Sequence, residues 1–380
     1  MTVWSELVGQ EPVVETLQAA VASAGGDGRS MTHAWLFTGP PGSGRSNAAM
    51  AFATALQCER GGCGECHSCT TAAAGSHPDI TGISTEGLTI GVDGIREYVR
   101  ASSLRPALGR WQVLIVEDAD RLTDQAAAAL LKAIEEPSKH TVWILCAPAA
   151  DDVLITLRSR SRSVILRTPG TAAIARLLVE RDGIEPVMAQ AVAAASQGHI
   201  GRARGLARDA GARERRRAIL SIPVSIHSLG DCMSAAQRIS DEATTRAADF
   251  CDRADEKELA ELRQAWGVEE RGRRPAGYAG AVGALEKDQK RRRTRLTRDG
   301  IDGVLLDLLS FCRDVLAVQC ARGVELVNAD VADDIAEMAE VWTPESTIRA
   351  IDAIVECRTA LTANAAPLLA LESMMIGLRR

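Results

Sequence analysis

The hydrophobic and polar positions of residues 1–170 alternate between short apolar runs and segments with helical spacing. The apolar runs are residues 35–38, 113–116, 142–147 and 164–166. Residues 46–56 and 123–136 have helical spacing, and the second segment has Asp124 near its start and Pro137 just past its end. Strands that alternate with helices predict an α/β layer with a mostly parallel sheet.

The pattern changes after Pro169. Residues 171–208 are rich in alanine with helical spacing, and Gly183 and Gly198 divide them. Farther along, no convincing strand pattern occurs, and apolar residues recur at three- and four-residue steps. The expected parts are an α/β domain over 1–170, a small helical domain over 171–211 and a larger helical domain over 212–380. Residues 267–283, rich in glycine and charge, predict a loop or mobile insertion.

Composition is that of an ordinary globular protein, with 380 residues, 46% hydrophobic and 25% charged. We expect no membrane span and no secretory signal, and hence a cytoplasmic protein. The net charge of −6 argues against a surface wholly devoted to nucleic acid. Residues 286–298 have a local balance of +5, whereas 301–380 have −7. A basic run of this kind is more often a solvated helix face than a nucleic-acid site.

Four of the ten cysteines lie within residues 58–69. Their spacing, Cys58-x4-Cys63-x2-Cys66-x2-Cys69, predicts a closed tetrahedral zinc site with a structural role. Disulfides are the alternative, disfavoured in a reducing compartment, and His67 could replace one thiolate. The remaining cysteines are interpreted as small core residues. They are Cys146, Cys232, Cys251, Cys312, Cys320 and Cys357.

Residues 39–46, Gly-Pro-Pro-Gly-Ser-Gly-Arg-Ser, fit the phosphate-loop pattern G-x-x-x-x-G-K-[ST] except that Arg45 replaces lysine. The candidate nucleotide-binding residues are Gly39, Pro40, Gly42, Ser43, Gly44, Arg45 and Ser46. Backbone N–H groups of the loop would bind phosphate oxygens, and Ser46 would contact Mg²⁺ of an ATP complex. Arginine keeps the charge but has a wider planar head, so a loop that keeps its shape and binds no nucleotide is the alternative.

The apolar run 113–116 ends in Glu117 and Asp118. Hydrolytic phosphate-loop enzymes place a magnesium-binding acid and a water-orienting acid here, in the order Asp then Glu. The reversed order shortens the water-orienting side chain by one methylene, and a misplacement of about 1 Å can cost roughly a hundredfold in rate. The pair predicts poor turnover, unless both acids are merely solvated.

Residues 157–162 contain three alternating arginines, Arg158, Arg160 and Arg162. An arginine at a subunit edge can reach a neighbour's γ-phosphate. Taken alone, these arginines are as well explained as surface residues.

Together, the phosphate loop, the four-cysteine knuckle after its helix, the apolar run with acids, Ala-Leu-Leu-Lys-Ala-Ile-Glu-Glu-Pro (129–137) and Leu-Arg-Ser-Arg-Ser-Arg (157–162) resemble the clamp-loader branch of AAA+ proteins. Within it, the chain resembles the delta-prime type of bacterial DNA polymerase III subunit. The resemblance implies an AAA+ domain with a zinc knuckle, a helical lid and an all-α collar. Residues 210–285 match weakly.

The resemblance further implies a hetero-oligomeric, pentameric ring with gamma/tau and delta subunits, which loads the sliding clamp onto primed DNA using ATP. In such rings the gamma/tau subunits are the ATPases, and Arg160 would be an arginine finger given to a neighbour. Gly201 stands where active members carry a nucleotide-sensing arginine, and Ala147-Pro148 stands where a sensing polar residue is expected. The chain would thus be at most a weak ATPase within the holoenzyme, and not itself a polymerase.

Three other interpretations stay open from the sequence. The chain could be an active gamma/tau-type ATPase. It could be a zinc-containing nucleic-acid-binding regulator, or a phosphate-loop kinase of a small substrate. The kinase interpretation is the weakest, because no substrate pocket is indicated.

Overall fold

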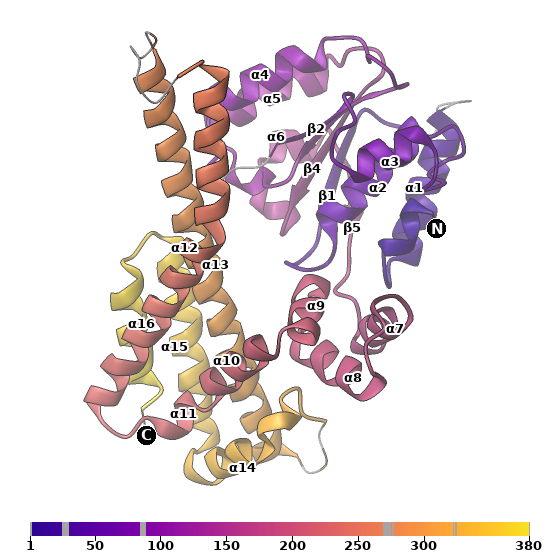
Figure 1. The fold of residues 1–380 in the computed structure, drawn as a ribbon. Coiled ribbons are helices and arrows are strands. Elements are labelled where there is room, and N and C mark those ends of the chain that lie inside the picture. The colour runs from indigo at the N-terminus through magenta and orange to yellow at the C-terminus, as the bar shows by residue number, and fades with distance from the viewer. Residues whose placement is uncertain are drawn as a thin grey trace. The chain divides into compact units, whose positions relative to one another are not determined.

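The computed structural model describes residues 2–24, 30–83, 89–268, 275, 277–321, 323 and 325–379. The chain divides into two compact units, Met1–Ala207 and Arg208–Arg380, whose ribbons are drawn in Figure 1. Within the described ranges, no helix combines the length and apolar character that crossing a membrane requires.

Unit 1 is built on a five-stranded sheet in the order β2-β3-β4-β1-β5, and all four pairings are parallel. The strands are β1 (Ala34–Thr38), β2 (Ile80–Ile83), β3 (Gln112–Val116), β4 (Thr141–Ala147) and β5 (Arg162–Ile165). Since β4 lies between β1 and β3, the carboxyl ends of these two strands flank it. The predicted parallel α/β sheet is confirmed.

Helices cover both faces of this sheet. Trp35 and Phe37 pack with α1 (Glu11–Ala24) and α2 (Arg45–Gln57) on one face. Leu36 and Leu114 pack with α4 (Val92–Ser102) and α5 (Asp124–Glu135) on the other. This double burial explains why the strands are continuous apolar runs. The helices of unit 1 are α1 (Glu11–Ala24), α2 (Arg45–Gln57), α3 (His67–Ala73), α4 (Val92–Ser102), α5 (Asp124–Glu135), α6 (Ile155–Arg158), α7 (Thr171–Asp182), α8 (Pro186–Ala195) and α9 (Ile200–Arg208). Short 3-10 turns are η1 (Val3–Glu6), η2 (Ala119–Arg121) and η3 (Ala150–Asp152).

A buried carboxylate fixes the loop between α4 and β3. Asp79, only 1% exposed, accepts hydrogen bonds from the backbone N–H groups of Ala107, Leu108 and Gly109 at 2.5, 2.9 and 2.5 Å. Burial alone would raise the pKa of Asp79, but these three donors outweigh it and hold the pKa below 3.8. The loop is thus held by an ionised side chain.

All the regular elements among the described residues of unit 2 are helices. Its helices are α10 (Ala210–Leu220), α11 (Ile222–Ser225), α12 (Leu229–Ala265), α13 (Tyr278–Cys320), α14 (Ala332–Val341), α15 (Pro344–Thr362) and α16 (Pro367–Gly377), with a 3-10 turn η4 (Ala329–Val331). One apolar core joins them and includes Leu305, Phe311, Ile335, Ile354 and Met375. The expectation of an all-α C-terminal region is confirmed.

A buried polar cluster ties α10 to α13 in this unit. The Nε atom of Arg216 donates to Asp307 at 2.8 Å, and both side chains are nearly inaccessible. Arg216 also donates to the side chain of Asn328. The backbone N–H of Asn328 donates to Asp314 at 2.8 Å. Because each buried charge has a partner here, the cluster fixes the loop before η4 on the helices.

One sequence prediction is changed by the structure. Part of the predicted loop 267–283 is helical, because α13 begins at Tyr278, whose ring packs 6.1 Å from that of Trp266. Residues 269–274 and 276 of that prediction lie outside the described residues. The predicted division into 1–170, 171–211 and 212–380 stays a prediction.

Candidate functional site

The predicted phosphate loop connects β1 to α2. Gly42 and Gly44 have positive φ angles of 84° and 90°, a conformation that side chains other than glycine rarely adopt. At Gly42 an added Cβ would lie 2.7 Å from the Cα of His199. The sequence therefore needs glycine here both for the backbone turn and because His199, directly before α9, packs on the loop.

Gln10 braces the loop from the N-terminal segment. Its Nε2 atom donates to the carbonyl oxygens of Ser43 at 3.3 Å and Arg167 at 2.6 Å, and its Oε1 atom accepts from Arg167 N at 3.2 Å. The side chain is 2% exposed. One buried amide thus joins the phosphate loop to the segment that leads into the lid.

Two polar atoms of the loop lack hydrogen-bond partners among the described residues. They are the Oγ of Ser43 and the Nη1 of Arg45, and both are buried. A buried donor without a partner is costly, and a bound anion would satisfy it. Ser46, one position into α2, is exposed at the helix N-terminus. These features fit a phosphate group held by the loop, and the donors present are of the right kind for one.

The predicted acids lie at the same edge of the sheet. Glu117 directly follows β3, and its backbone N–H donates to Ile83 O at 2.9 Å. Burial raises the pKa of Cys146 on β4 to about 12, and the charges of Arg45, Glu117 and Asp118 all act on that thiol. Burial, with a smaller contribution from Asp118, also raises the pKa of Asp120. The structure thus brings the loop and the acids together across β4.

Arg160 lies in the turn after α6, with its side chain partly exposed. Its Nη2 atom forms an ion pair with Glu135 Oε1 at 2.7 Å, and both side chains are 42% exposed. Its Nη1 atom donates to Thr156 O at 3.1 Å. An exposed ion pair of this kind contributes at most about 1 kcal/mol of stability. Arg160 can therefore release Glu135 and bind a more highly charged anion in its place.

The two neighbouring arginines are used differently. Arg158 pairs with Asp151. Arg162 donates to Ser30 O at 2.6 Å, and its guanidinium lies 5.0 Å from the centre of the Trp35 ring. Arg162 therefore contributes to the fold of the sheet, whereas Arg158 and Arg160 both form exposed ion pairs.

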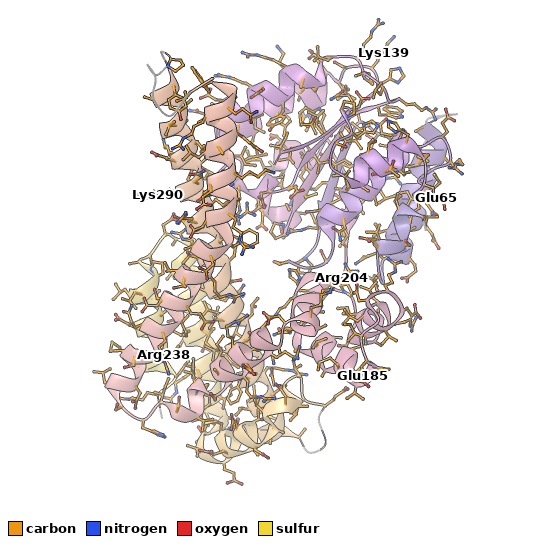
Figure 2. All side chains as sticks on the ribbon, in the orientation of Figure 1. Glu65, Lys139, Glu185, Arg204, Arg238 and Lys290 are labelled. Carbon is orange, nitrogen blue, oxygen red and sulfur yellow. The ribbon has the colours of Figure 1, made fainter. Side chains whose placement is uncertain are left out.

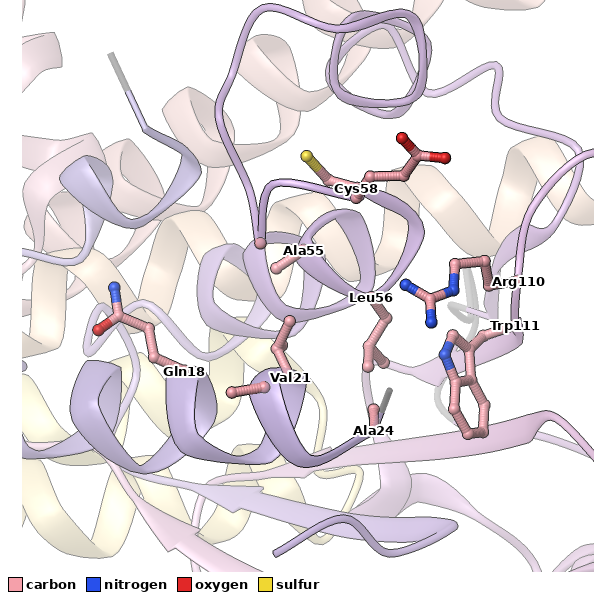
Figure 3. A pocket seen from close by; sticks show the side chains of 11 residues that line it. Gln18, Val21, Ala24, Ala55, Leu56, Cys58, Arg110 and Trp111 are labelled. Carbon is pink, nitrogen blue, oxygen red and sulfur yellow. The ribbon is translucent and has the colours of Figure 1, made fainter. Parts of the chain in front are cut away.

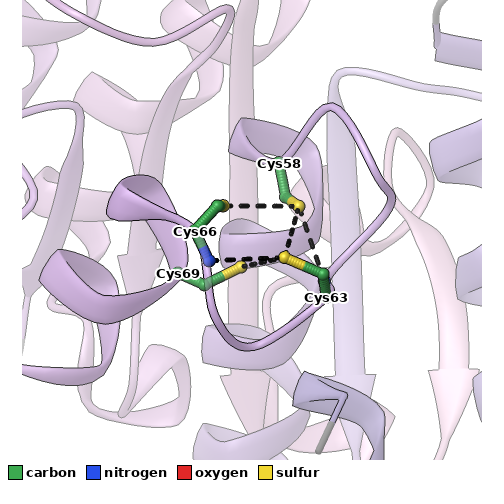
Figure 4. A group of neighbouring side chains, drawn as sticks. All are labelled: Cys58, Cys63, Cys66 and Cys69. Carbon is green, nitrogen blue, oxygen red and sulfur yellow. Dashed lines mark hydrogen bonds between the residues drawn. The ribbon is translucent and has the colours of Figure 1, made fainter.

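The four clustered cysteines meet in space at the other end of α2 (Figure 4). Their sulfur atoms all lie within 4.8 Å of one another. The Cys58–Cys63, Cys58–Cys66 and Cys63–Cys69 sulfur pairs are 3.7, 3.7 and 4.0 Å apart. Four sulfurs at about 2.3 Å from one zinc ion are roughly 3.8 Å apart in a tetrahedron. The cluster therefore has the size that a tetrahedral thiolate site needs.

Backbone N–H groups point at these sulfurs. Cys63 N donates to the Sγ of Cys58 and Cys66 N to the Sγ of Cys63, both at 3.4 Å. Backbone donors lower the pKa of Cys63 to about 6. Burial raises the pKa of Cys69 to about 12, so its thiolate would need a cation close by. The donor set fits a metal ion that binds thiolates, whereas His67 does not join it.

The knuckle is also bound to the N-terminal turn. Val3 N donates to Gly62 O at 3.0 Å, and Trp4 Nε1 donates to Gly61 O at 3.0 Å. At Gly62, with φ of 102°, an added Cβ would lie 2.5 Å from Val3. The knuckle is thus packed into unit 1, which is what a structural site requires.

A pocket of about 400 Å³ lies beside Cys58 (Figure 3). Gln18 and Val21 of α1, together with Arg110 and Trp111, contribute to its wall. Its lining includes no residue of the phosphate loop, which lies at the opposite end of α2. It does not supply the substrate pocket that a small-molecule kinase needs next to its phosphates.

Sequence reasoning missed the contacts that Gln10 and His199 make with the loop. Gln10 and Ser43 are 33 residues apart, and no local periodicity reports such a contact. The roles of the predicted phosphate-loop residues, of the acidic pair and of Arg160 stay predictions.

Comparison with known proteins shows which family the N-terminal region of the chain resembles. Residues 9–169 match the family described as DNA polymerase III, delta subunit. Over these residues the chain is similar to DNA polymerase III subunits. The expected resemblance to clamp-loader subunits of the delta-prime kind is therefore confirmed. The DNA polymerase III subunit delta' of Pseudomonas aeruginosa is 36% identical over 178 residues, which are 45% of this chain and 54% of that protein.

Relatives of two kinds, gamma/tau and delta', are about equally similar to this chain. The DNA polymerase III subunit gamma/tau of Mycobacterium tuberculosis is 34% identical over 190 residues, which are 48% of this chain and 32% of that protein. The subunit delta' of Escherichia coli is 38% identical over 143 residues, which are 36% of this chain and 43% of that protein. The chain thus spans from about a third to about half of these relatives. Identity alone does not separate a delta-prime-like clamp-loader subunit from a gamma/tau-like one.

Among solved structures, a DNA polymerase III gamma subunit-related protein from Thermotoga maritima is 17% identical with a TM-score of 0.47. The superposition covers 96% of this chain and 98% of that protein. A likeness at this level carries no argument about function.

Proposed function

We propose that this chain is a delta-prime-like subunit of the DNA polymerase III clamp loader, with little ATPase activity of its own. It joins gamma/tau and delta subunits in a pentameric ring in the cytoplasm. The ring loads the sliding clamp onto primed DNA. The chain contributes Arg160 to the nucleotide site of a neighbouring subunit. The single observation that carries this proposal is the combination of an altered phosphate loop with Arg160, a partly exposed arginine held by one exposed ion pair.

Three departures support weak turnover in the chain's own site. Arg45 replaces the lysine whose compact charge reaches the β- and γ-phosphates. Glu117 and Asp118 stand in reverse order, which shortens the water-orienting side chain. Gly201 occupies the position of a nucleotide-sensing arginine. The partnerless Ser43 Oγ and Arg45 Nη1 still favour binding of a phosphate group, so we expect the loop to bind ATP with Mg²⁺ at Ser46 more readily than it supports hydrolysis.

Zinc is the metal that we propose for Cys58, Cys63, Cys66 and Cys69. Four thiolates leave no open position for water or substrate, so the ion would stabilise the knuckle and take no part in a reaction. Its role would be to keep the N-terminal turn and the end of α2 together.

The arginine finger is tested in the reconstituted loader. Arg160→Ala should lower the ATP turnover of the complete, DNA-stimulated complex by about a thousandfold at each site that depends on it, because the guanidinium stabilises charge in the transition state. Arg158→Ala is the matched control, since Arg158 is a neighbouring, partly exposed arginine paired with Asp151. Unchanged turnover in the assembled Arg160→Ala complex would refute the finger.

An active gamma/tau-type ATPase is the second candidate. The similarity to the mycobacterial gamma/tau relative favours it, as does the intact glycine pattern of the loop. It requires brisk ATP turnover by the isolated chain that Ser46→Ala abolishes. A zinc-dependent nucleic-acid-binding regulator would instead lose DNA binding when Cys63 or Cys66 is replaced.

A further inference from the structure

The basic run 286–298 lies on α13, within the long antiparallel pair that α12 and α13 form. The two helices extend beyond the other helices of unit 2 (Figure 1). Residues of the apolar core reach Ala243 on α12 and Ile301 on α13. Beyond them, α12 buries Ala247, Cys251 and the charged Asp255. The extended part of the pair, residues 244–265 and 278–300, is named the arm below.

Inside the arm, two arginines of the basic run 286–298 form ion pairs with acidic side chains of α12. Arg292 binds Asp255 and Glu258, each at 2.6 Å, and is 16% exposed. Arg293 binds Asp252 and Asp255, each at 2.7 Å. These contacts hold the two helices together. They explain only the inward part of the basic run.

Four of the five remaining cations of the run share the outward face of α13, whereas Arg295 pairs with Asp299 at 3.7 Å. Lys287, Lys290, Arg291 and Arg298 are separated by three, one and seven residues, a spacing that places them on one face of a helix. The first three are exposed, and Lys290 is labelled on the arm in Figure 2. These four residues are named the outward stripe.

Few contacts within the described residues neutralise the positive charge of the outward stripe. Arg291 pairs with Asp288 at 3.1 Å, and both side chains are more than half exposed, so this pair is weak. Arg298 donates to the neutral amide oxygen of Asn364 at 2.8 Å. No acid stands at the intervening position of this face, which is Thr294. The stripe therefore presents concentrated positive charge to solvent.

The outer face of α12 also carries basic residues, three against the four of the outward stripe, but its charge pattern differs. Arg246, Arg253 and Lys257 lie there at helical spacing, but Asp249 and Glu256 alternate with them. Lys257 also pairs with Glu261 at 3.7 Å. Charges of both signs cancel on this face, so it has no net attraction for a polyanion.

We propose that the outward stripe of α13 binds the phosphate backbone of duplex DNA. The stripe is about 16 Å long at 1.5 Å per residue, and the same length of duplex carries about nine phosphate charges. The face holds no large apolar side chain between its cations, since Gly283, Ala284 and Thr294 complete it. A protein partner would need such an anchor. A phosphate backbone needs only the charges.

Fluorescence anisotropy of the isolated full-length chain with a labelled duplex tests this, independently of the proposed function. Four cations should give a log–log salt slope of about −3.6, which is about a fifty-fold loss of affinity from about 50 mM to about 150 mM salt. Replacing Lys287, Lys290 and Arg291 by Gln should reduce the slope to about −0.9, because one cation remains. Gln is chosen because it retains the helix propensity of Lys and Arg.

The matched control replaces Arg246, Arg253 and Lys257 by Gln, which removes the same charge from the other face. It should keep the wild-type affinity within about twofold and the wild-type slope. An equal loss in both triple variants, an unchanged stripe variant, or a wild-type chain that binds no duplex at low salt would each overturn the proposal. The last result would be expected if an acidic protein occupies the stripe. Should the triple variant lose its helical circular dichroism, Lys290→Gln alone should still reduce the slope by about 0.9.

Discussion

The two ends of helix α2 carry sites that differ in completeness. At its start, the phosphate loop keeps its glycines and its positive charge, but Arg45 and the reversed Glu117–Asp118 pair depart from a hydrolytic site. At its end, four sulfurs approach within 4.8 Å of one another, with backbone N–H groups directed at them. The chain has thus retained the groups that maintain its structure more fully than those that would carry out hydrolysis.

The same contrast holds for the contacts around the two sites. The knuckle is fixed to η1 through Val3 and Trp4. The phosphate loop is equally well braced by Gln10 and packed against His199. The loop therefore keeps its shape, and only the groups that would act on the γ-phosphate are changed. The weak turnover that we propose would follow from this difference.

The largest expected effect is at the knuckle. Cys66→Ser should reduce the zinc content from about one ion per chain to near none, because three thiolates no longer close the tetrahedron. Elemental analysis of the purified protein measures this, with Cys320→Ser as the control, since Cys320 is exposed and lies outside the cluster. Full zinc occupancy in Cys66→Ser, or a wild-type chain that purifies without metal, would show that the cluster is not a zinc site.

A smaller effect is expected where unit 1 depends on a buried charge. Asp79→Asn should lower the free energy of unfolding of unit 1 by about 2 kcal/mol, since the amide cannot accept from all three backbone donors. The pKa of Asp79 is depressed, so its contribution is present above the unfolded value of 3.8 and is lost as the pH falls through the lower folded value. Chemical denaturation at neutral and acidic pH measures both effects.

The outcome for Asp79 is distinguishable from a general loss of stability. The difference between wild type and Asp79→Asn should shrink as the pH falls below 3.8. A difference that stays constant down to the lowest pH at which the protein folds would contradict an ionised Asp79 in the folded state.

The smallest effect concerns the altered phosphate loop. Arg45→Lys should raise ATP affinity about fivefold, or ~1 kcal/mol, because lysine has the compact head that the loop pattern expects. Turnover should stay low, since Glu117 and Asp118 remain reversed. Calorimetric titration and a turnover assay on the same sample separate binding from hydrolysis. Equal ATP affinities of the wild type and Arg45→Lys would show that Arg45 binds the phosphates as well as a lysine does.

The sequence predicted those helices and strands that local patterns of apolar and polar residues indicate. The runs 113–116 and 142–147 coincide with β3 and β4, and residues 46–56 lie within α2. The four cysteines were identified by spacing alone, and the structure brings them together. Strand β2 was missed because Ile80–Ile83 is only partly buried and contains Gly82, so it has no continuous apolar run.

Contacts between distant segments could not be predicted in the same way. The bond from Gln10 to Ser43 and the packing of His199 on Gly42 depend on the folded sheet and lid. The basic run 286–298 was treated as one feature, whereas α12 divides it into inward arginines that bind acids and an outward stripe. That division depends on where the partner helix packs, which the charge pattern does not state.

ATP turnover by the isolated full-length chain tests the central claim most directly. The account predicts turnover close to that of the Ser46→Ala variant, because the wild-type site lacks the lysine and the ordered acidic pair of a hydrolytic phosphate loop. Rapid turnover by the wild-type chain that Ser46→Ala abolishes would contradict it, and would make the chain a motor subunit in its own right.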